Sequence, residues 1–226
     1  EHAIGKSGQS AALAKCLAKL DAGDVDVTTV QKLCDEVDAI MDGLEVPKEI
    51  ITAMKGLAQE YATSTQSPPD AVRLIARSSA NVEDMVDVSG AGLYESLGGL
   101  DASSDDNLAA GVRRVWKSLF TARAVLSRQA AGITQDSARM AVLVQPMAVA
   151  DLSFVLHTSS PLDRDPTLLV AEVAPGLGET LAAGTEGTAW RFQVDKSHRR
   201  VDTLAFANFS RALSMAPPVG TVPANV

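Results

Sequence analysis

The sequence predicts a mixed α/β or α+β fold, because helical and strand-like patterns occupy different stretches of the chain. Helical spacing of apolar residues fills the first third. Short apolar runs typical of strands recur from residue 72 onward, with one long helical pattern between them. No internal repeat is present. This order of patterns is typical of domains in which helices cover a sheet.

Three helices are expected in the first third of the chain, at Ser10–Leu20, Thr28–Met41 and Pro47–Tyr61. In each, apolar residues recur three or four positions apart and would form one buried face. Thr28 with Gln31 matches a capping box, Gly43 is suited to the end of a helix, and Pro47 to a first turn.

Five strands are expected later, at Val72–Ala76, Met140–Val144, Phe154–Thr158, Thr167–Val173 and Trp190–Val194. Ser103 or Ser104 is expected to cap one long helix that continues toward Gln129. The segment from Pro217 to the end is rich in Pro and Val and predicts a loose tail or linker.

Composition restricts the partners of this protein. A length of 226 residues is enough for a buried core in one large or two small domains. The net charge is −8, whereas a nucleic-acid surface needs a clustered excess of Lys and Arg. The densest basic clusters, Arg113-Arg114 and Lys196–Arg200, are too short for that role. We therefore expect no nucleic-acid partner.

The chain also lacks the marks of a membrane or secreted protein. Its apolar stretch Met140–Leu156 is interrupted by polar residues and a proline, so no membrane partner is expected. Cys16 and Cys34 form no metal-binding pattern and predict free thiols in a reducing compartment, with a disulfide as the alternative. The N-terminus has no signal or transit signature and no initiator Met, so the chain is expected to begin inside a longer protein.

The most informative segment is Arg77-Ser78-Ser79-Ala80-Asn81-Val82-Glu83-Asp84, followed by Gly90-Ala91-Gly92. Arg77 is expected at the end of the strand that begins at Val72, where small residues follow it. A guanidinium beside small residues that let backbone N–H groups approach is well suited to holding a phosphate. The alternative is a structural salt bridge from Arg77 to Glu83 or Asp84.

This segment resembles the nucleotide-binding segment of the pyruvate phosphate dikinase and phosphoenolpyruvate synthase family, in which R-S-S-A-x-x-E-D precedes a Gly-rich turn. The strings at 91–96, 178–191 and 202–210 look most like the starch-phosphorylating branch of plants and algae, the glucan and phosphoglucan water dikinases. The resemblance covers about residues 70–213, and the earlier helices fit more loosely.

The apolar run Met140–Met147 is by itself a core strand that ends in an amide and a thioether. The family has a similar V-x-V-Q-x-M strand at the hinge between two subdomains, where backbone groups hold the adenine. The resemblance therefore implies that Gln145 and Met147 line the base pocket.

A second signal follows further along the chain. Glu172 is expected at the end of an apolar strand, where a carboxylate is costly unless it meets a cation. Glu179 comes after two glycines, and both carboxylates offer the hard oxygen ligands of a Mg²⁺ site that bridges ATP phosphates. The alternative is a solvated Glu172 and a turn that caps a helix at Thr180. The family pattern E-x-x-x-G-x-G-E implies Glu172 and Glu179 as metal ligands and Gly178 in the ATP site.

The resemblance implies an ATP-grasp-like nucleotide-binding domain that is truncated at its N-terminus. Residues 1–70 would form the helical part of the first subdomain, and residues 71–147 its Arg-bearing strand, Gly-rich loop and long helix up to the hinge. Residues 148–213 would form the second subdomain with the metal site, and residues 214–226 a loose tail or linker.

The implied activity is that of a dikinase, a phosphotransferase that uses Mg²⁺ and ATP and gives AMP and phosphate. The β-phosphoryl group would pass to a histidine on a separate domain, and the γ-phosphoryl group to water. The phosphohistidine would then phosphorylate an α-glucan such as starch in the plastid stroma.

This chain departs from the family in two ways. The family has a Gly-rich, Lys-containing segment ahead of the point where this chain starts, and Lys6 is a poor substitute for it. The Cys-x-His motif of the phosphohistidine domain is absent from the sequence. No catalytic residue is therefore expected here, and the fragment alone should at best bind ATP and depend on the rest of its own chain.

Other function classes remain open. A non-catalytic nucleotide-binding or interaction module would keep the fold without turnover. Gly5-Lys6-Ser7 is the tail of a P-loop signature, but the required earlier glycine lies off the chain. His157 is expected to end a strand near the pocket, and Asn208 is either a second metal ligand or a helix N-cap.

Overall fold

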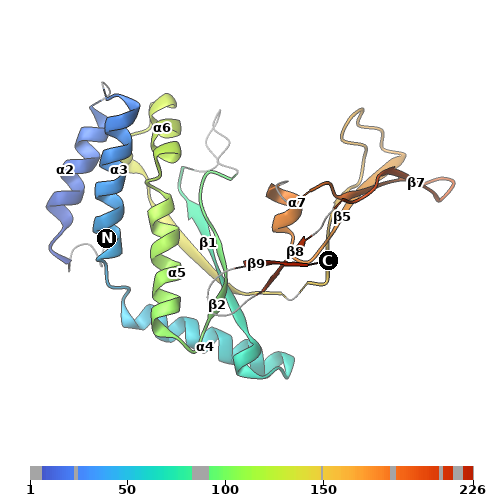
Figure 1. The fold of residues 1–226 in the computed structure, drawn as a ribbon, viewed down its shortest axis with the longest axis horizontal. Helices are drawn as coiled ribbons and strands as arrows, with labels where there is room; N and C mark the ends of the chain where they lie inside the picture. Colours follow the sequence, from blue (N-terminus) through green and yellow to red (C-terminus); the bar gives the residue numbers. More distant parts are fainter. Residues whose placement is uncertain are drawn as a thin grey trace. The chain divides into compact units, whose positions relative to one another are not determined.

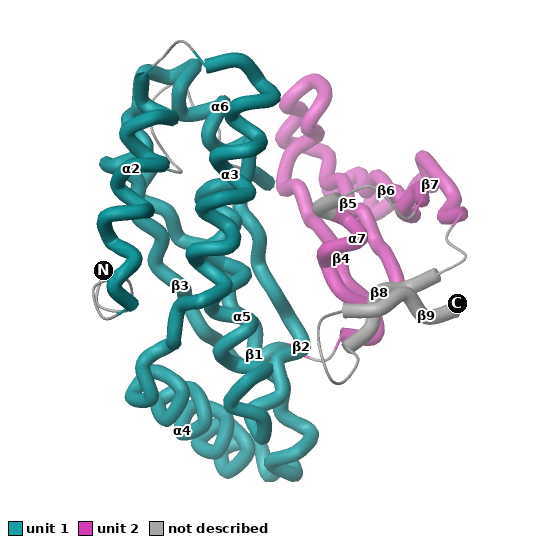
Figure 2. The backbone as a smooth tube through the Cα atoms, turned by 60° about the vertical axis from the view of Figure 1, so that its left-hand side comes forward, with its two compact units in different colours: residues 1–147, 217–220 teal, residues 148–216, 221–226 magenta. Residues whose placement is uncertain are grey.

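A computed structural model describes residues 7–22, 25–82, 92–148, 150–183, 187–208, 211–215 and 221–225. The chain divides into two compact units (Figure 2). Unit 1 contains residues 1–147 and 217–220, and unit 2 contains residues 148–216 and 221–226. Helices and strands occur together in the chain, so the mixed helix-and-sheet class expected from the sequence is confirmed.

Unit 1 is a three-stranded sheet with helices on one side (Figure 1). The sheet order is β2-β1-β3, and both strand pairs are antiparallel. Helix α5 contacts all three strands, and α4 contacts β3. The elements are α2 (Ser10–Asp21), α3 (Val27–Asp42), α4 (Lys48–Thr65), η1 (Pro69–Ala71), β1 (Arg73–Ala80), β2 (Leu97–Asp101), α5 (Asp105–Ser118), α6 (Ala122–Ala130), η2 (Gln135–Ser137) and β3 (Met140–Pro146).

The register between β1 and β3 gives the sheet two different faces. Leu74 and Ala76 of β1 are buried, and Val144, the partner of Ala76, packs against the same core under α4 and α5. The alternate residues of both strands lie on the face away from these helices, where Arg77, Leu143 and Gln145 are exposed and Ile75 is half-buried. One face of the sheet is therefore structural, and the other is open to a ligand.

The helix ends follow short-range capping and correct two sequence predictions. Asp26, and not Thr28, caps α3, because its carboxylate accepts from the Thr29 N–H at 3.0 Å. The long helix expected to run toward Gln129 is instead two helices. Ser104 caps α5, and Thr121 caps α6 by accepting from the Ala124 N–H at 3.3 Å. Among the described helices, none is long and apolar enough to cross a membrane.

Several strands also differ from the prediction. Strand β1 continues to Ala80, because Leu74–Ala80 pairs with β3 without interruption, and Arg77 therefore lies inside the strand and not at its end. Strand β2 was not expected, because its sequence contains two glycines and glycine is a poor strand former. The expected free thiols are confirmed, since Cys16 and Cys34 are buried and unpaired with each other.

Unit 2 is built on a four-stranded antiparallel sheet in the order β4-β5-β6-β7. Its elements are β4 (Leu152–His157), β5 (Leu168–Pro175), α7 (Glu179–Ala183), β6 (Trp190–Asp195), β7 (Arg200–Ala205), β8 (Arg211–Met215) and β9 (Thr221–Asn225). The expected loose tail after residue 214 is corrected in part, because β8 and β9 pair with each other. The prediction depended on the proline-rich composition of this segment, but proline is tolerated in the edge strands of a sheet.

Arg128 of α6 is the largest fully buried side chain of the described residues, and it joins four segments of unit 1. Its Nη2 donates to the Leu119 carbonyl at 2.6 Å, its Nε to Gln135 Oε1 at 2.8 Å, and its Nη1 to the Tyr94 hydroxyl at 3.4 Å. The guanidinium also lies 6.0 Å from the ring centre of Phe120. Burial lowers the pKa of Arg128, and these partners offset the cost of desolvating its charge.

The close approach of α5 to β2 generates a stability prediction. A Cβ added to Gly111 would lie 2.7 Å from both Cδ atoms of Leu100, which is fully buried. We expect Gly111→Ala to lower the free energy of unfolding by about 1–3 kcal/mol, as overpacked cores do. Urea unfolding followed by circular dichroism measures it.

Gly56 of α4 provides the matched control, because a Cβ there meets nothing within 4 Å. Gly56→Ala should raise the free energy of unfolding by about 0.5–1 kcal/mol through helix propensity alone. An equal change in the free energy of unfolding in both variants would show that the Leu100 side chain moves aside at no cost. The close approach of α5 to β2 would then not limit the residue at position 111.

Candidate functional site

Arg77 and Gln145 lie together on the open face of the unit 1 sheet. The register partner of Gln145 is Ile75, and Arg77 follows two positions later on the same strand. Such diagonal neighbours on one face have Cβ atoms about 7–8 Å apart, within reach of long side chains. Both side chains are exposed. The pair thus offers a planar five-donor guanidinium and an amide to one polar ligand.

Met147 follows β3 directly and lies against the same sheet. Its N–H donates to the Arg73 carbonyl at 2.8 Å, and its Sδ lies 3.2 Å from the Gly99 nitrogen of β2. Pro146, the residue before it, has no N–H. Neither Pro146 nor Met147 therefore has a backbone N–H left to donate to an adenine ring. What Met147 can offer to a base is its half-buried thioether side chain.

The residues after Arg77 have structural partners. The Ser78 N–H donates to Ser96 Oγ at 3.4 Å. The Asn81 amide donates to the Ser137 carbonyl at 3.1 Å and accepts from the Arg139 N–H at 2.7 Å. Glu83, Asp84 and the start of the Gly-rich turn lie outside the described residues, and the proposed salt bridge of Arg77 falls there.

Glu172 lies in the middle of β5 and meets a cation. Arg191 of β6 is its direct register partner. The Arg191 Nε donates to Glu172 Oε1 at 2.8 Å, and Nη2 lies 2.5 Å from the same oxygen. The Glu172 side chain is 25% exposed. The prediction of a strand-end position is therefore wrong, and so is the alternative of a merely solvated carboxylate.

Gly178 and Glu179 lie close to β5, because Glu179 is the first residue of α7 and α7 contacts β5. Val170 and Ala174 flank Glu172 on the same face of β5, and both are buried. Thr180 is only 2% exposed, and its Oγ1 has no hydrogen-bond partner among the described residues. The turn thus places one exposed carboxylate and one unsatisfied hydroxyl beside each other.

Glu172 and Glu179 supply the hard oxygen donors that Mg²⁺ prefers. Within the part of the chain that the structure describes, no three or more His, Cys, Asp or Glu side chains form a metal-binding group. Two carboxylates suffice when phosphates and water complete the shell, although Arg191 already occupies one oxygen of Glu172. Mg²⁺ held by Glu172 and Glu179 would therefore need further ligands from phosphates and water.

Three polar residues of unit 2 have other roles. The Asn208 side chain accepts from the Thr188 N–H at 2.5 Å, and the next described element is a strand, so the helix-cap alternative is wrong. His157 is exposed and ends β4, as predicted. His198 Nδ1 lies 2.8 Å from Asp195 Oδ2, and this contact raises the pKa of His198 and lowers the pKa of Asp195 to about 2.

Arg191 is the residue near the candidate site that sequence reasoning missed. Nothing in the run Trp190–Asp195 distinguishes it from an ordinary exposed arginine. Its importance comes from its position opposite Glu172, which depends on the register of β5 and β6. Alternation along a strand predicts which face a residue occupies, but not which residue lies across from it.

A sequence family described as the pyruvate phosphate dikinase AMP/ATP-binding domain matches residues 1–214 of this chain. The match includes both units and every candidate site residue described above.

Individual relatives are similar over most of this chain. A probable phosphoenolpyruvate synthase from Staphylothermus marinus is 33% identical over 189 residues, which are 81% of this chain and 22% of that protein. A rifampicin phosphotransferase from Bacillus cereus is 27% identical over 184 residues, with coverages of 81% and 20%. A phosphoenolpyruvate synthase from Pyrococcus furiosus is 29% identical over 168 residues, with coverages of 74% and 20%. The chain spans about a fifth of the length of these relatives.

Proposed function

This chain belongs to the pyruvate phosphate dikinase AMP/ATP-binding domain family, and we propose that it is the ATP-binding part of a dikinase with an ATP-grasp-like arrangement. In this proposal Arg77 holds ATP phosphates, Gln145 and Met147 line the base pocket, and Gly178 lies beside the nucleotide. The family to which the chain belongs binds ATP as a substrate and acts in phosphoryl transfer.

The observation that carries the proposal is the shared open face of Arg77 and Gln145. A guanidinium can donate two parallel hydrogen bonds to a phosphate, and the amide next to it can both donate and accept. The opposite face of the same sheet is packed under α4 and α5, which holds the two strands in register. The strands are thus rigid supports for two adaptable polar side chains.

We propose that Mg²⁺ binds to Glu172 and Glu179 together with ATP phosphates. Mg²⁺ held there would offset negative charge on the phosphates. Glu172 would keep Arg191 as its neighbour through one oxygen and offer the other to the metal. Arg191 would thus help to orient the carboxylate, because it holds Oε1 through a hydrogen bond and an ion pair.

The proposed reaction passes the β-phosphoryl group of ATP to a histidine outside this chain and the γ-phosphoryl group to water. The residues of this chain would position the phosphates and stabilise their charge, and they would form no covalent bond. The Cys-x-His motif of the phosphohistidine domain does not occur in the 226 residues. We therefore propose no catalytic residue within them.

For the final acceptor we propose an α-glucan or phosphoglucan, and thus a plastid protein of starch phosphorylation. The support is the set of strings at 91–96, 178–191 and 202–210, which resemble the glucan and phosphoglucan water dikinases. The names of the similar proteins point elsewhere, to phosphoenolpyruvate synthesis and to the phosphorylation of rifampicin. A non-catalytic nucleotide-binding module is the alternative class, in which the same side chains bind ATP without turnover.

The first prediction concerns Arg77. Arg77→Ala should weaken ATP affinity about tenfold or more, because a charged hydrogen-bond donor contributes about 1.5–3 kcal/mol. Isothermal titration calorimetry measures it. Arg123→Ala, an exposed arginine of α6, changes the net charge equally and should leave the affinity unchanged. Equal affinity in Arg77→Ala and the parent would make Arg77 a structural residue.

The second prediction concerns the metal. Glu172→Gln keeps the shape of the side chain and removes its charge, so Mg²⁺ should no longer strengthen ATP binding, while metal-free ATP binding stays the same. Arg191→Gln is the matched control, because it breaks the same ion pair and keeps the carboxylate. If the Mg²⁺ dependence is unchanged in Glu172→Gln, Glu172 is not the ligand and the metal site lies elsewhere.

The third prediction concerns turnover. With β-labelled ATP and an α-glucan, the isolated chain should transfer no label to the glucan, because it lacks the phosphohistidine motif. Pyruvate and rifampicin should stay unlabelled for the same reason. Label on any acceptor would contradict the proposal and direct the search to His157 and His198.

A further inference from the structure

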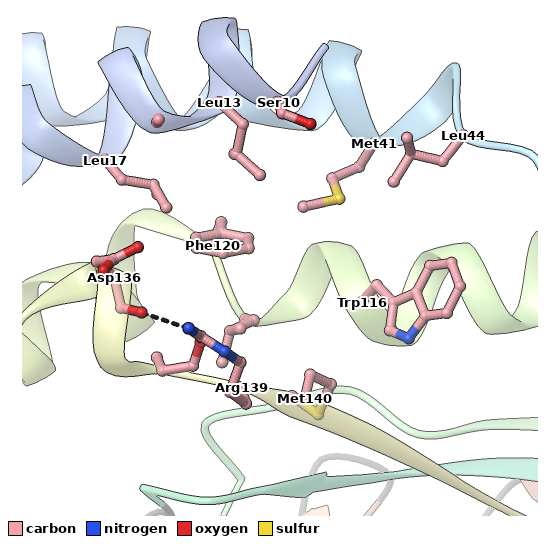
Figure 3. A pocket seen from close by; sticks show the side chains of 13 residues that line it. Ser10, Leu13, Leu17, Met41, Leu44, Trp116, Phe120, Asp136, Arg139 and Met140 are labelled. Carbon is pink, nitrogen blue, oxygen red and sulfur yellow. Dashed lines mark hydrogen bonds between the residues drawn. The ribbon is translucent and has the colours of Figure 1, made fainter. Parts of the chain in front are cut away.

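Unit 1 contains a hollow in its hydrophobic core that the proposed ATP site does not use (Figure 3). The hollow has a volume of about 330 Å³ and is lined by parts of α2, the end of α3, the end of α5 and the segment that leads into β3. Ten of the thirteen lining residues are apolar, and the other three are Ser10, Asp136 and Arg139. Ser10, Ala14, Asp136 and Arg139 are exposed, so the hollow opens to solvent at its rim, and its volume would hold about ten water molecules.

The hollow lies on the other side of the sheet from the candidate ATP residues. Met140 lines it and belongs to the helix-covered face of β3, whereas Gln145 points to the open face. The two residues are also separated by about 17 Å along the strand, at about 3.4 Å a residue. A ligand in the hollow would therefore leave ATP binding unobstructed.

The apolar walls restrict what can occupy the hollow. Leu17, Leu119 and Phe120 are each less than 9% exposed, so the walls belong to the packed core. Trp116 and Phe120, four positions apart on α5 and the turn after it, present two aromatic rings. These walls offer water few hydrogen-bond partners, and covering their apolar surface is favourable. The body of the occupant is therefore apolar.

One end of the hollow carries both signs of charge. Figure 3 shows Asp136 and Arg139 at the end near Leu17, while Trp116 and Leu44 line the opposite end. The Arg139 guanidinium is held in place by donating from Nη1 to the carbonyls of Asp136 and, at 2.9 Å, Ala138. The guanidinium thus places a fixed positive charge at this end of the hollow. The Asp136 carboxylate is exposed at the same end.

From this arrangement we propose that the hollow binds a small apolar zwitterion, namely a free α-amino acid with a large apolar side chain. Its side chain would fill the space between Leu17, Phe120 and Trp116. Its carboxylate would meet Arg139, and its ammonium group Asp136. The volume of the hollow suits such a ligand, because the number of heavy atoms in phenylalanine is close to the number of water molecules that the hollow would hold.

The test uses the fluorescence of Trp116 in the full 226-residue chain. Trp190→Phe removes the other tryptophan, so the signal reports on the hollow alone. L-Phenylalanine should change the fluorescence saturably. 3-Phenylpropanoate, without the ammonium group, and 2-phenylethylamine, without the carboxylate, should each bind roughly fivefold more weakly, as expected for one exposed ion pair. The absence of a saturable change, or equal affinity for all three compounds, would overturn the proposal.

Two pairs of variants locate the ligand. Ala14→Leu fills the hollow from α2 and should abolish binding, whereas Ala18→Leu, one turn along the same helix and outside the lining, should not. Arg139→Gln should weaken L-phenylalanine binding about fivefold and leave 2-phenylethylamine unaffected, which a merely structural effect would not do. Unchanged binding in Ala14→Leu would place the ligand elsewhere and refute the proposed site.

Discussion

The buried guanidinium of Arg128 is the interaction on which the arrangement of unit 1 depends. A charge without water must be satisfied by several partners, and those of Arg128 come from separate segments: Leu119 after α5, Gln135 of η2 and Tyr94 before β2. Each bond fixes a place where the chain changes direction. The break between α5 and α6, the entry into β3 and the return from the Gly-rich segment are therefore coupled, because moving any one of them would leave the buried charge unsatisfied.

The sheet held by this network has two faces with different tasks. The face under α4 and α5 belongs to the hydrophobic core, and at the Met140 end the core remains hollow. The other face presents Arg77 and Gln145 to solvent. Side chains alternate along a strand, so the register of β1 and β3 determines at once which residues are buried and which face solvent. A slip of one residue would exchange the buried and the exposed side chains. The fold thus separates the candidate nucleotide residues from the hollow by the sheet itself and by the length of β3 between Met140 and Gln145.

In unit 2 strand register likewise determines a single cross-strand pair, Glu172 and Arg191. Glu172 is tolerated between the buried residues Val170 and Ala174 because Arg191 lies directly opposite, donates a hydrogen bond from Nε and forms an ion pair with it. The pair is partly exposed, so it contributes little to stability on its own. Its main effect is to hold the carboxylate in one orientation beside the turn that leads into α7.

The sequence alone determined the family, the mixed fold class, most helices and most strands, because these depend on short-range spacing and local motifs. It also identified Arg77, Gln145 and Glu172 as notable residues, although their roles in binding stay predictions. Only the tertiary structure decided that Arg77 lies within β1, that one long helix is two, that Leu97–Asp101 forms a strand despite its glycines, and that Arg191 meets Glu172. These features depend on pairing between residues far apart in the chain, and such pairing leaves no periodic signal in the sequence.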